Sequence, residues 1–232
     1  VYFFGMKEHL TFYNFSMGHQ FVKKYSSDGA LIWEKFITGE AHALAIQADA
    51  SGGIYLAGNF ITMIDFWGEL TLEYTGITPN NFIVKINAEV EVLWGTVLED
   101  YTMVYGNVYT LTTDQTGLVY IAYTDFMDSW ILIMNEDGTI IDSIVQENVM
   151  LITGIDVDNS GNIFASGGCA NLYSTFGGVI FPAPFSYTTY VVKYNSSHEP
   201  VWVRYIEDIT CSQFQVKSDQ SGGVYLAGQF FP

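Results

Sequence analysis

The chain has 232 residues, of which 49% are hydrophobic and 16% aromatic, so it can bury a core and is neither a disordered tail nor a collagen-like rod. Acidic residues number 25 against 8 basic ones, and the net charge of −17 excludes a protein that neutralises nucleic-acid phosphates with Lys and Arg. We expect no membrane-spanning segment, because no apolar run approaches the roughly 18 residues that a spanning helix needs.

The predicted elements are strands, and the first of them is the apolar segment 1–5. No basic residues precede it, so it does not resemble a signal peptide. Phe21-Val-Lys-Lys and a segment with Trp33 follow. Their β-branched and aromatic content favours strands over helices.

Further along the chain, these segments return in a regular order. Asp49-Ala-Ser-Gly-Gly-Ile-Tyr-Leu-Ala-Gly58 returns as Asp219-Gln-Ser-Gly-Gly-Val-Tyr-Leu-Ala-Gly228, and looser copies begin at Asp114 and Asp158. Between them lie Phe21-Val-Lys-Lys, Phe82-Ile-Val-Lys, Trp130-Ile-Leu-Ile and Tyr190-Val-Val-Lys, whose starts are 61, 48 and 60 residues apart. Twelve residues after each start comes Trp33, Trp94, Asp142 or Trp202. This period suits one propeller blade with variable loops.

Each copy predicts four short strands, which we call a, b, c and d. The Asp-x-Ser/Thr-Gly element joins a to b as a turn, because Asp and Ser oxygens accept nearby backbone N–H groups and Gly adopts positive φ. Hairpin turns at 26–29, 135–138 and 195–198 join c to d, so neighbouring strands are antiparallel. We expect the aligned side chains around the a–b turns to be buried: Ile46, Leu111, Ile155, Val216, Tyr55, Tyr120, Phe164 and Tyr225.

The copies resemble the SBBP β-propeller repeats of secreted and surface proteins. The resemblance rests on the Asp-x-Ser-Gly strand signal, Gly58-Asn-Phe60, Asp65-Phe66 with Leu70-Thr-Leu72, Phe82-Ile-Val-Lys and the Trp of strand d. It covers nearly the whole chain, although NHL-type repeats share the strand signal. It implies an all-β propeller of four-stranded antiparallel blades. The third copy departs most, with Ile133 and Asp142 where the others have Lys and Trp.

We expect one β-propeller repeat array over residues 1–232, with units at about 1–48, 49–113, 114–157 and 158–218 and a partial unit at 219–232. The chain starts and ends in strand b and so has five copies of b but four of c. We therefore expect a window of a larger propeller, completed by neighbouring blades or domains of a longer chain. The first strand and the hairpin 214–228 should then be sheet edges.

The candidate metal and catalytic sites favour structural interpretations. Asp156-Val-Asp158-Asn-Ser160-Gly161 resembles the start of a calcium loop, but Gly167 replaces the Glu at its twelfth position, so we expect a plain turn and no metal. His9, His19, His42 and His198 fall at unrelated positions, and no zinc-type pairing exists among them. Arg204 is the only arginine, which argues against a sialidase-like site. We expect no catalytic residue and no cofactor.

Three further features leave alternatives open. The paired acids Glu99-Asp100, Glu136-Asp137 and Glu207-Asp208 could serve a glycosidase, but adjacent acids in a strand point to opposite faces. Cys169 and Cys211 form one disulfide or remain buried thiols, and they lack C-x-x-C spacing. Asn14 and Asn195 begin sequons for N-glycosylation.

The long connections suggest a binding face. The b-to-c and d-to-a connections share one face, where the segments 59–81, 124–129 and 168–189 vary between copies, and variation on a common scaffold builds specificity. Their aromatic residues stack on a sugar or anchor a protein, or else cover the outer edges of the blades: Phe66, Trp67, Tyr74, Tyr173, Phe181, Phe185 and Tyr187.

The sequence thus predicts a noncatalytic module of a secreted or cell-surface protein, a scaffold that binds a protein or a glycan. The alternatives are a propeller hydrolase or lyase acting on a polysaccharide, and a purely structural subunit of a surface assembly.

Overall fold

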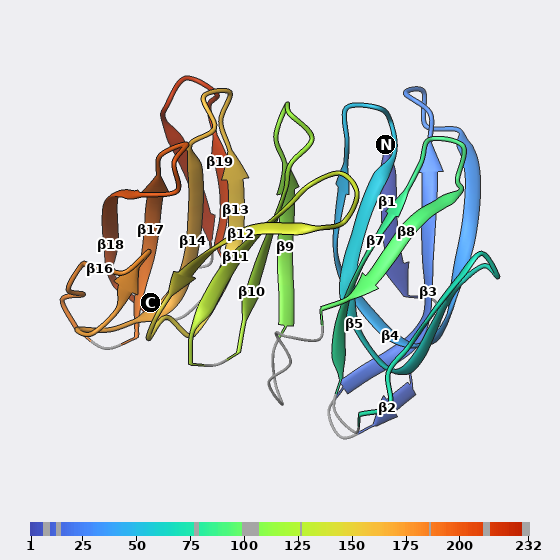
Figure 1. Cartoon of the computed structure of the whole chain (residues 1–232), viewed down its shortest axis with the longest axis horizontal. Coiled ribbons are helices and arrows are strands. Elements are labelled where there is room, and N and C mark those ends of the chain that lie inside the picture. The colour runs from blue at the N-terminus through green and yellow to red at the C-terminus, as the bar shows by residue number, and fades with distance from the viewer. Residues whose placement is uncertain are drawn as a thin grey trace. The chain divides into compact units, whose positions relative to one another are not determined.

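The computed structural model is all-β and describes residues 1–6, 10–12, 15–76, 79–98, 107–125, 127–185, 187–210 and 214–228 (Figure 1). No helix occurs in these ranges, so none of them offers a helix that could cross a membrane. The chain divides into two compact units, Val1–Tyr105 and Gly106–Pro232. The all-β expectation is confirmed, and neighbouring strands in the described sheets pair antiparallel.

The first unit contains one eight-stranded sheet. Its main path runs β1-β3-β4-β5-β7-β8, while β2 pairs with β3 and β6 pairs with β5. The bounds are β1 Tyr2–Met6, β2 Leu10–Phe12, β3 Phe15–Tyr25, β4 Leu31–Ala48, β5 Ile54–Phe66, β6 Leu70–Glu73, β7 Asn80–Ile86 and β8 Val92–Val97.

Strand β4 differs from the prediction of short, separate strands. Its 18 residues serve as strand d of one sequence copy, paired with β3, and then as strand a of the next copy, paired with β5. The two pairings overlap at residues 37–41, which include Gly39, where φ is +116° and a Cβ atom would overlap the carbonyl oxygen of Met63. Glycine at this position therefore lets one strand continue through the expected connection.

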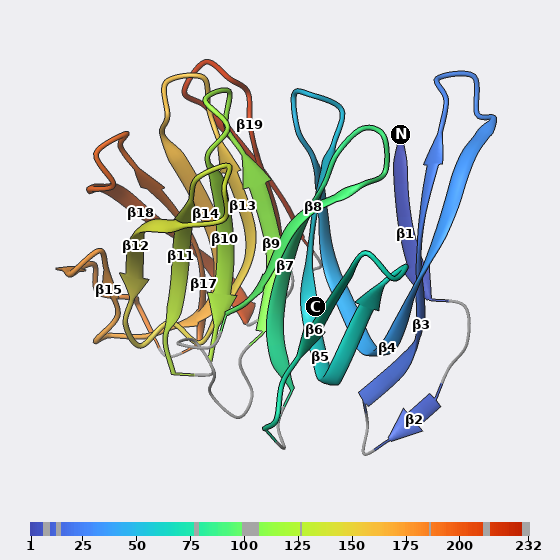
Figure 2. The same ribbon diagram turned by 45° about the vertical axis from the view of Figure 1, so that its right-hand side comes forward.

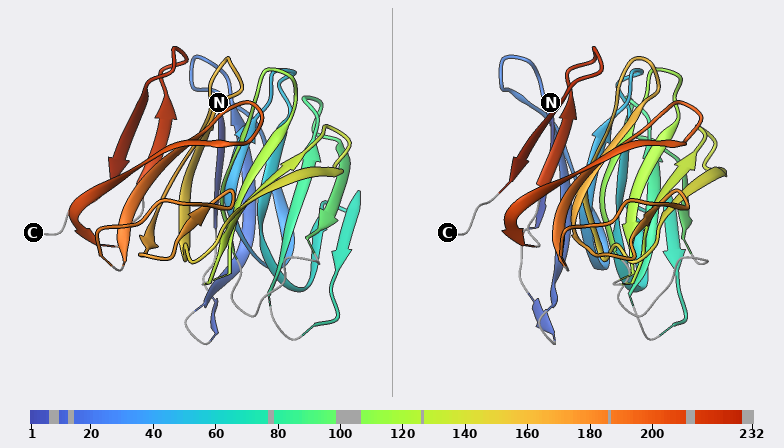
Figure 3. Two further views of the ribbon diagram at one scale, coloured as in Figure 1. Left: turned by 60° about the vertical axis from the view of Figure 1, so that its left-hand side comes forward. Right: turned by 90° about the vertical axis from the view of Figure 1, so that its left-hand side faces the viewer.

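The second unit contains two four-stranded sheets and two small hairpins (Figures 2 and 3). One sheet has the order β12-β11-β10-β9, and the other has the order β13-β14-β17-β18; β13 lies beside β9 and β10 and also beside β19. The bounds are β9 Asn107–Thr113, β10 Val119–Thr124, β11 Ser129–Met134, β12 Ile140–Gln146, β13 Leu151–Val157, β14 Ile163–Ala170, β15 Thr175–Phe176, β16 Val179–Ile180, β17 Thr188–Tyr194, β18 Pro200–Thr210, β19 Phe214–Ser218 and β20 Val224–Gly228.

Each unit has its own hydrophobic core. Residues from β5 and β7 dominate the first core, and residues from β10, β11, β13, β14 and β17 dominate the second. Of the side chains expected to be buried, six are, and Ile46 is half-buried. Tyr225 is an error of prediction, because it is 70% exposed. It lies on β20, which pairs only with β19 among the described strands, so no further strand covers it.

The four a–b turns share one hydrogen-bonding pattern. In each turn an Asp Oδ1 atom accepts the backbone N–H of the residue four positions later, at 2.8–3.0 Å. The glycine three positions after each Asp has φ between 76° and 100°. These local bonds confirm the predicted turn chemistry of Asp49, Asp114, Asp158 and Asp219.

A row of three side chains crosses the sheet in three of the sequence copies. In each row an aromatic residue of strand b pairs with a Lys of strand c, which pairs with the Trp of strand d. The rows are Tyr2, Lys24 and Trp33; Tyr55, Lys85 and Trp94; and Phe164, Lys193 and Trp202. The Lys Nζ atoms lie 3.8–5.2 Å from the strand-b ring centroids, within cation–π range.

In the third copy, the same register places Tyr120, Ile133 and Asp142 in a row. Asp142 Oδ2 lies 2.5 Å from Nδ1 of His198, which belongs to the turn between β17 and β18. The acid that replaces Trp thus links the two four-stranded sheets of the second unit.

Candidate functional site

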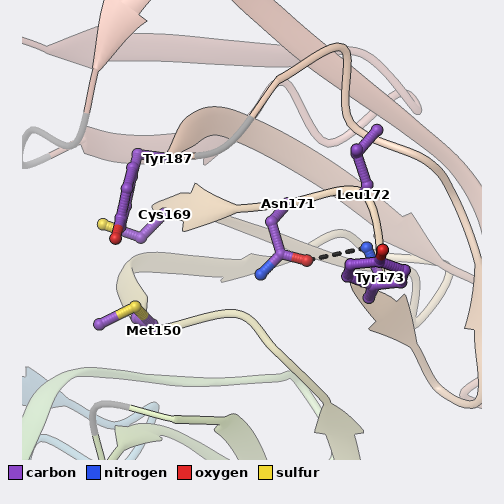
Figure 4. A pocket seen from close by; sticks show the side chains of 6 residues that line it. All are labelled: Met150, Cys169, Asn171, Leu172, Tyr173 and Tyr187. Atoms are coloured by element: carbon purple, nitrogen blue, oxygen red, sulfur yellow. Dashed lines mark hydrogen bonds between the residues drawn. The ribbon is translucent and has the colours of Figure 1, made fainter.

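A pocket of about 230 Å³ lies at one end of the β13-β14-β17-β18 sheet (Figure 4). Its wall comes from the segment before β13, from β14 and the turn after it, and from the residue before β17. These are d-to-a and b-to-c connections of the sequence copies. The lining residues are Met150, Cys169, Asn171, Leu172, Tyr173 and Tyr187.

The backbone around this pocket is held in an uncommon conformation. Cys169 and Tyr187 both have φ of 64°, and the nearby Asn148 has φ of 55°. Left-handed backbone is costly for residues other than glycine, so it persists only where the surroundings hold it in place. Cys169 is also disulfide-bonded. Cys211, the other cysteine of the chain, lies outside the described residues.

A small polar network supports the turn after β14. Asn171 Oδ1 accepts the backbone N–H of Tyr173 at 2.8 Å, as the dashed line in Figure 4 shows. The Ser174 hydroxyl donates to the carbonyl oxygen of Asn148 at 2.7 Å and accepts the N–H of Asn171 at 2.7 Å. The backbone N–H of Asn148 in turn donates to Asp128 Oδ1 at 2.7 Å. These bonds connect the b-to-c connection with the segment that carries Met150.

The chemistry of the pocket is mostly apolar. Its walls are formed by Met150, Leu172, the half-cystine and two tyrosine rings. The polar side-chain groups in the lining are the Asn171 amide and the two tyrosine hydroxyls. Aromatic rings with a polar edge bind partners well, because they bury large areas and still accept or donate hydrogen bonds. The pocket can thus accommodate a small, largely apolar group.

No family model matches the chain, and no curated protein matches it. A solved structure of a Bacteroides caccae protein of unknown function, determined at 1.35 Å resolution, is similar to it at 15% identity with a TM-score of 0.45. The similarity covers 90% of this chain and 78% of that one.

Two of the seven aromatic candidates, Tyr173 and Tyr187, meet at this pocket, where they are 77% and 57% exposed. In the same connection, Phe185 is 40% exposed, and Phe181 is half-buried with its ring 6.2 Å from that of Phe176. The structure does not place Phe181 or Phe185 in the pocket lining.

The three aromatic candidates of the first unit belong to its core or its margin. Phe66 is fully buried, with its ring 5.6 Å from that of Phe82, and has no exposed surface for a partner. Trp67 is half-buried against Phe66, and Lys35 lies 5.5 Å from its ring centroid. Tyr74 is half-buried and packs against the same core.

Asp156 and Asp158, the two acids of the calcium-loop resemblance, are occupied by the protein's own donors. Asp156 pairs with Lys217 Nζ at 2.5 Å and accepts the N–H of Ser218 at 2.7 Å. Asp158 accepts the N–H groups of Ser160 and Asn162. Among the described residues, no cluster of three or more His, Cys, Asp or Glu residues could hold a metal.

The other candidate polar residues lie away from the pocket lining. Glu136 and Asp137 are exposed in the turn between β11 and β12. Asn195 stabilises the next such turn, since its Oδ1 atom accepts the N–H groups of Ser197 and Glu199. Asn14, His9 and the pair Glu99-Asp100 lie outside the described residues. For His19, His42, Glu207 and Asp208 the structure describes the backbone alone.

His198 and Asp142 form an imidazole–carboxylate pair. The hydrogen bond with His198 is the main cause that lowers the pKa of Asp142 below its ordinary value, and the N–H of Ser143 adds to it. His198 has φ of 63° and is held within the turn 195–199, where its backbone N–H donates to Asn195. The pair therefore connects two sheets at the turn.

The sequence did not indicate four of the six lining residues: Met150, Cys169, Asn171 and Leu172. One signal was available, because Asn171-Leu-Tyr-Ser174 has the Asx-turn composition that forms at this corner. No local signal could reveal Met150, which belongs to a different connection.

Proposed function

We propose that the chain is a noncatalytic β-propeller module, of the SBBP type that its sequence resembles, in a secreted or cell-surface protein. In this proposal it acts as a scaffold that binds a protein or glycan partner through the face of its long connections.

The propeller part of the proposal is supported by the recurrence of one antiparallel unit. The antiparallel pairing of strands b and c recurs in all four sequence copies and the cross-strand row in three of them, and four-stranded antiparallel sheets are the elements of a propeller. A radial arrangement of the sheets in a crystal structure would support the propeller, and any other packing of the sheets would contradict it.

The compartment is supported by one observation. Cys169 is disulfide-bonded, and disulfides persist in oxidising environments such as the cell exterior. Thiol titration of the denatured protein, purified from its native source with and without reductant, tests this. Free thiols that appear only after reduction are expected, and thiols present before reduction would contradict the proposal.

The binding role depends on the meeting of Tyr173 and Tyr187 at one pocket on a variable connection. The test is to screen the whole chain against a glycan array and a random peptide library. Binding should fall in the double variant Tyr173→Ala/Tyr187→Ala and persist in Asp219→Asn, which changes an exposed a–b turn. Absence of any bound glycan or peptide, or equal loss in both variants, would contradict the proposal.

A hydrolase or lyase acting on a polysaccharide is the second candidate, and the His198–Asp142 pair at 2.5 Å is the observation that favours it. A histidine oriented by a carboxylate is a common general base. Turnover on a panel of polysaccharides that is abolished by His198→Gln would establish this alternative. Turnover-free binding would support the noncatalytic module.

A further inference from the structure

The connection 171–187 exposes an unusual amount of apolar surface. Five of its side chains other than Tyr187 are at least 40% exposed: Leu172, Tyr173, Val179, Ile180 and Phe185. Solitary exposed apolar residues are normal on a protein surface, but a group on one connection marks an interaction site.

The pocket on this connection suits an apolar side chain better than a sugar ring. A buried sugar must have its hydroxyl groups hydrogen-bonded, because unpaired polar groups are costly to remove from water. The amide in the lining belongs to Asn171, and its Oδ1 atom is already bonded to the Tyr173 backbone. Apart from the hydroxyl groups of Tyr173 and Tyr187, the other lining side chains present methylene, methyl, sulfur and ring carbon atoms.

The charge around the pocket indicates which residues should flank the apolar side chain in a partner. Within the second unit, residues 107–192 contain nine acidic residues and no Lys or Arg. The pocket belongs to this stretch, and two of the acids, Asp128 and Glu147, hydrogen-bond to Asn148 and Thr175 beside its frame. A partner with basic residues would be attracted to this region, and an acidic partner would be repelled.

We infer that the pocket receives one aromatic or large aliphatic side chain of a protein partner, flanked in that partner by Lys or Arg. The inference rests on the proposed binding function and specifies its ligand class. The apolar residue serves as the anchor, in the way that a few buried side chains carry most of the affinity of protein interfaces. The basic flanks increase the association rate and the preference for this partner.

The experiment uses the full chain and a phage-displayed library of random dodecapeptides. An enriched peptide is synthesised, and its affinity is measured by fluorescence anisotropy. The variants are Tyr173→Ala and Tyr187→Ala at the pocket and Tyr225→Ala as a matched control, because Tyr225 is 70% exposed on β20. Unchanged melting temperatures establish that each variant folds.

The expected peptides contain an aromatic or large aliphatic residue next to Lys or Arg. Their affinity should fall about tenfold or more in either pocket variant, remain unchanged in Tyr225→Ala, and weaken as salt is raised. Leu172→Lys should weaken a basic peptide more than its uncharged analogue.

Several results would overturn the inference. Enriched peptides without an apolar anchor or without basic residues would do so, as would peptides insensitive to the pocket variants. A glycan from an array that binds in place of peptides, and is lost in the pocket variants, would overturn the ligand class but leave the proposed binding function intact. Failure of both peptides and glycans to bind would overturn the two together.

Discussion

Residues 61–79 of the first unit and 171–187 of the second occupy the same place in their sequence copies, between strands b and c. Each contains a short hairpin, formed by β5 and β6 in one unit and by β15 and β16 in the other. Each also buries one phenylalanine against the first aromatic residue of strand c. Phe66 lies 5.6 Å from Phe82, and Phe176 lies 5.1 Å from Tyr190, both with edge-on ring geometry.

The residues after the phenylalanine make the difference. In the first unit, Trp67, Leu70 and Leu72 pack onto the core. In the second unit, Gly177 and Gly178 take up the turn, and the following Val179 and Ile180 are 46% and 63% exposed. One anchor thus supports a connection that completes the core in one unit and a connection that presents apolar surface in the other.

The shared anchor predicts the largest effect. Phe66→Ala and Phe176→Ala each remove a fully buried ring, so each should lower the free energy of unfolding by about 3–5 kcal/mol. Urea unfolding of the two variants tests the equivalence. A small loss in only one of them would show that the two hairpins are not anchored alike.

A smaller difference is expected at the lysines of the cross-strand rows. Lys85 is 7% exposed and hydrogen-bonds to Asp49, so Lys85→Met should cost about 2 kcal/mol. Lys193→Met is the matched control. Lys193 lies over the Phe164 ring, and Asp158, which corresponds to Asp49 in that copy, accepts a hydrogen bond from the Asn162 side-chain amide. Equal losses in the two variants would contradict the assigned role of the Asp49 contact.

The same pair predicts a dependence on pH. Burial would raise the pKa of Asp49, but hydrogen bonds from Lys85 and Ser51 outweigh it and hold the pKa below the ordinary 3.8. The carboxylate therefore stabilises the fold above the unfolded pKa, and this contribution is lost as pH falls through the lower folded pKa. NMR titration should find the Asp49 pKa higher in Lys85→Met than in the wild type.

At the connections themselves, Trp67→Ala should cost about 1–2 kcal/mol, because half of a large ring leaves its packing against Phe66. Tyr173→Ala should change the free energy of unfolding by less than about 0.5 kcal/mol, since the side chain is 77% exposed. Thermal unfolding compares them, and a destabilised Tyr173→Ala would mean that this connection, too, is part of the core.

A small gain in stability is expected at the c–d turns. Val90 and His198 occupy equivalent turn positions with φ of 76° and 63°, and a β-branched residue is strained there. Val90→Gly should raise the free energy of unfolding by about 0.5–1 kcal/mol. His198→Gly should gain less, because it also loses the contact with Asp142. A larger gain at His198 would show that this contact does not stabilise the second unit.

Features that depend on neighbouring residues in the chain could be predicted from the sequence. The a–b turn is decided within five residues, by an Asp oxygen and a Gly, and its hydrogen bonds occur in all four copies. The spacing of strand-c Lys and strand-d Trp likewise follows from a tight hairpin, which sets the register of the two strands.

Features that depend on distant partners could not be predicted in the same way. Tyr225 follows the same local pattern as Tyr55, yet Tyr225 is 70% exposed and Tyr55 is 1% exposed, because among the described strands only that of Tyr55 has a partner on both sides. The pocket needs Met150 from a different connection than Tyr173 and Tyr187. Phe66 and Tyr173 are both aromatic loop residues by sequence, and only tertiary packing separates the buried one from the exposed one.

Strand β4 has a consequence for how such chains can be recombined. Its sequence belongs to two copies, but its backbone is one continuous strand whose pairing register with β5 shifts after Gly39. If modules from two parent proteins were exchanged with a crossover inside residues 31–48, the two halves of β4 would come from different parents. Any side chain introduced at position 39 would then meet the Met63 carbonyl oxygen. Crossovers placed in the a–b turns, whose hydrogen bonds close within five residues, would leave the pairings of β4 with β3 and β5 and the backbone at Gly39 unchanged.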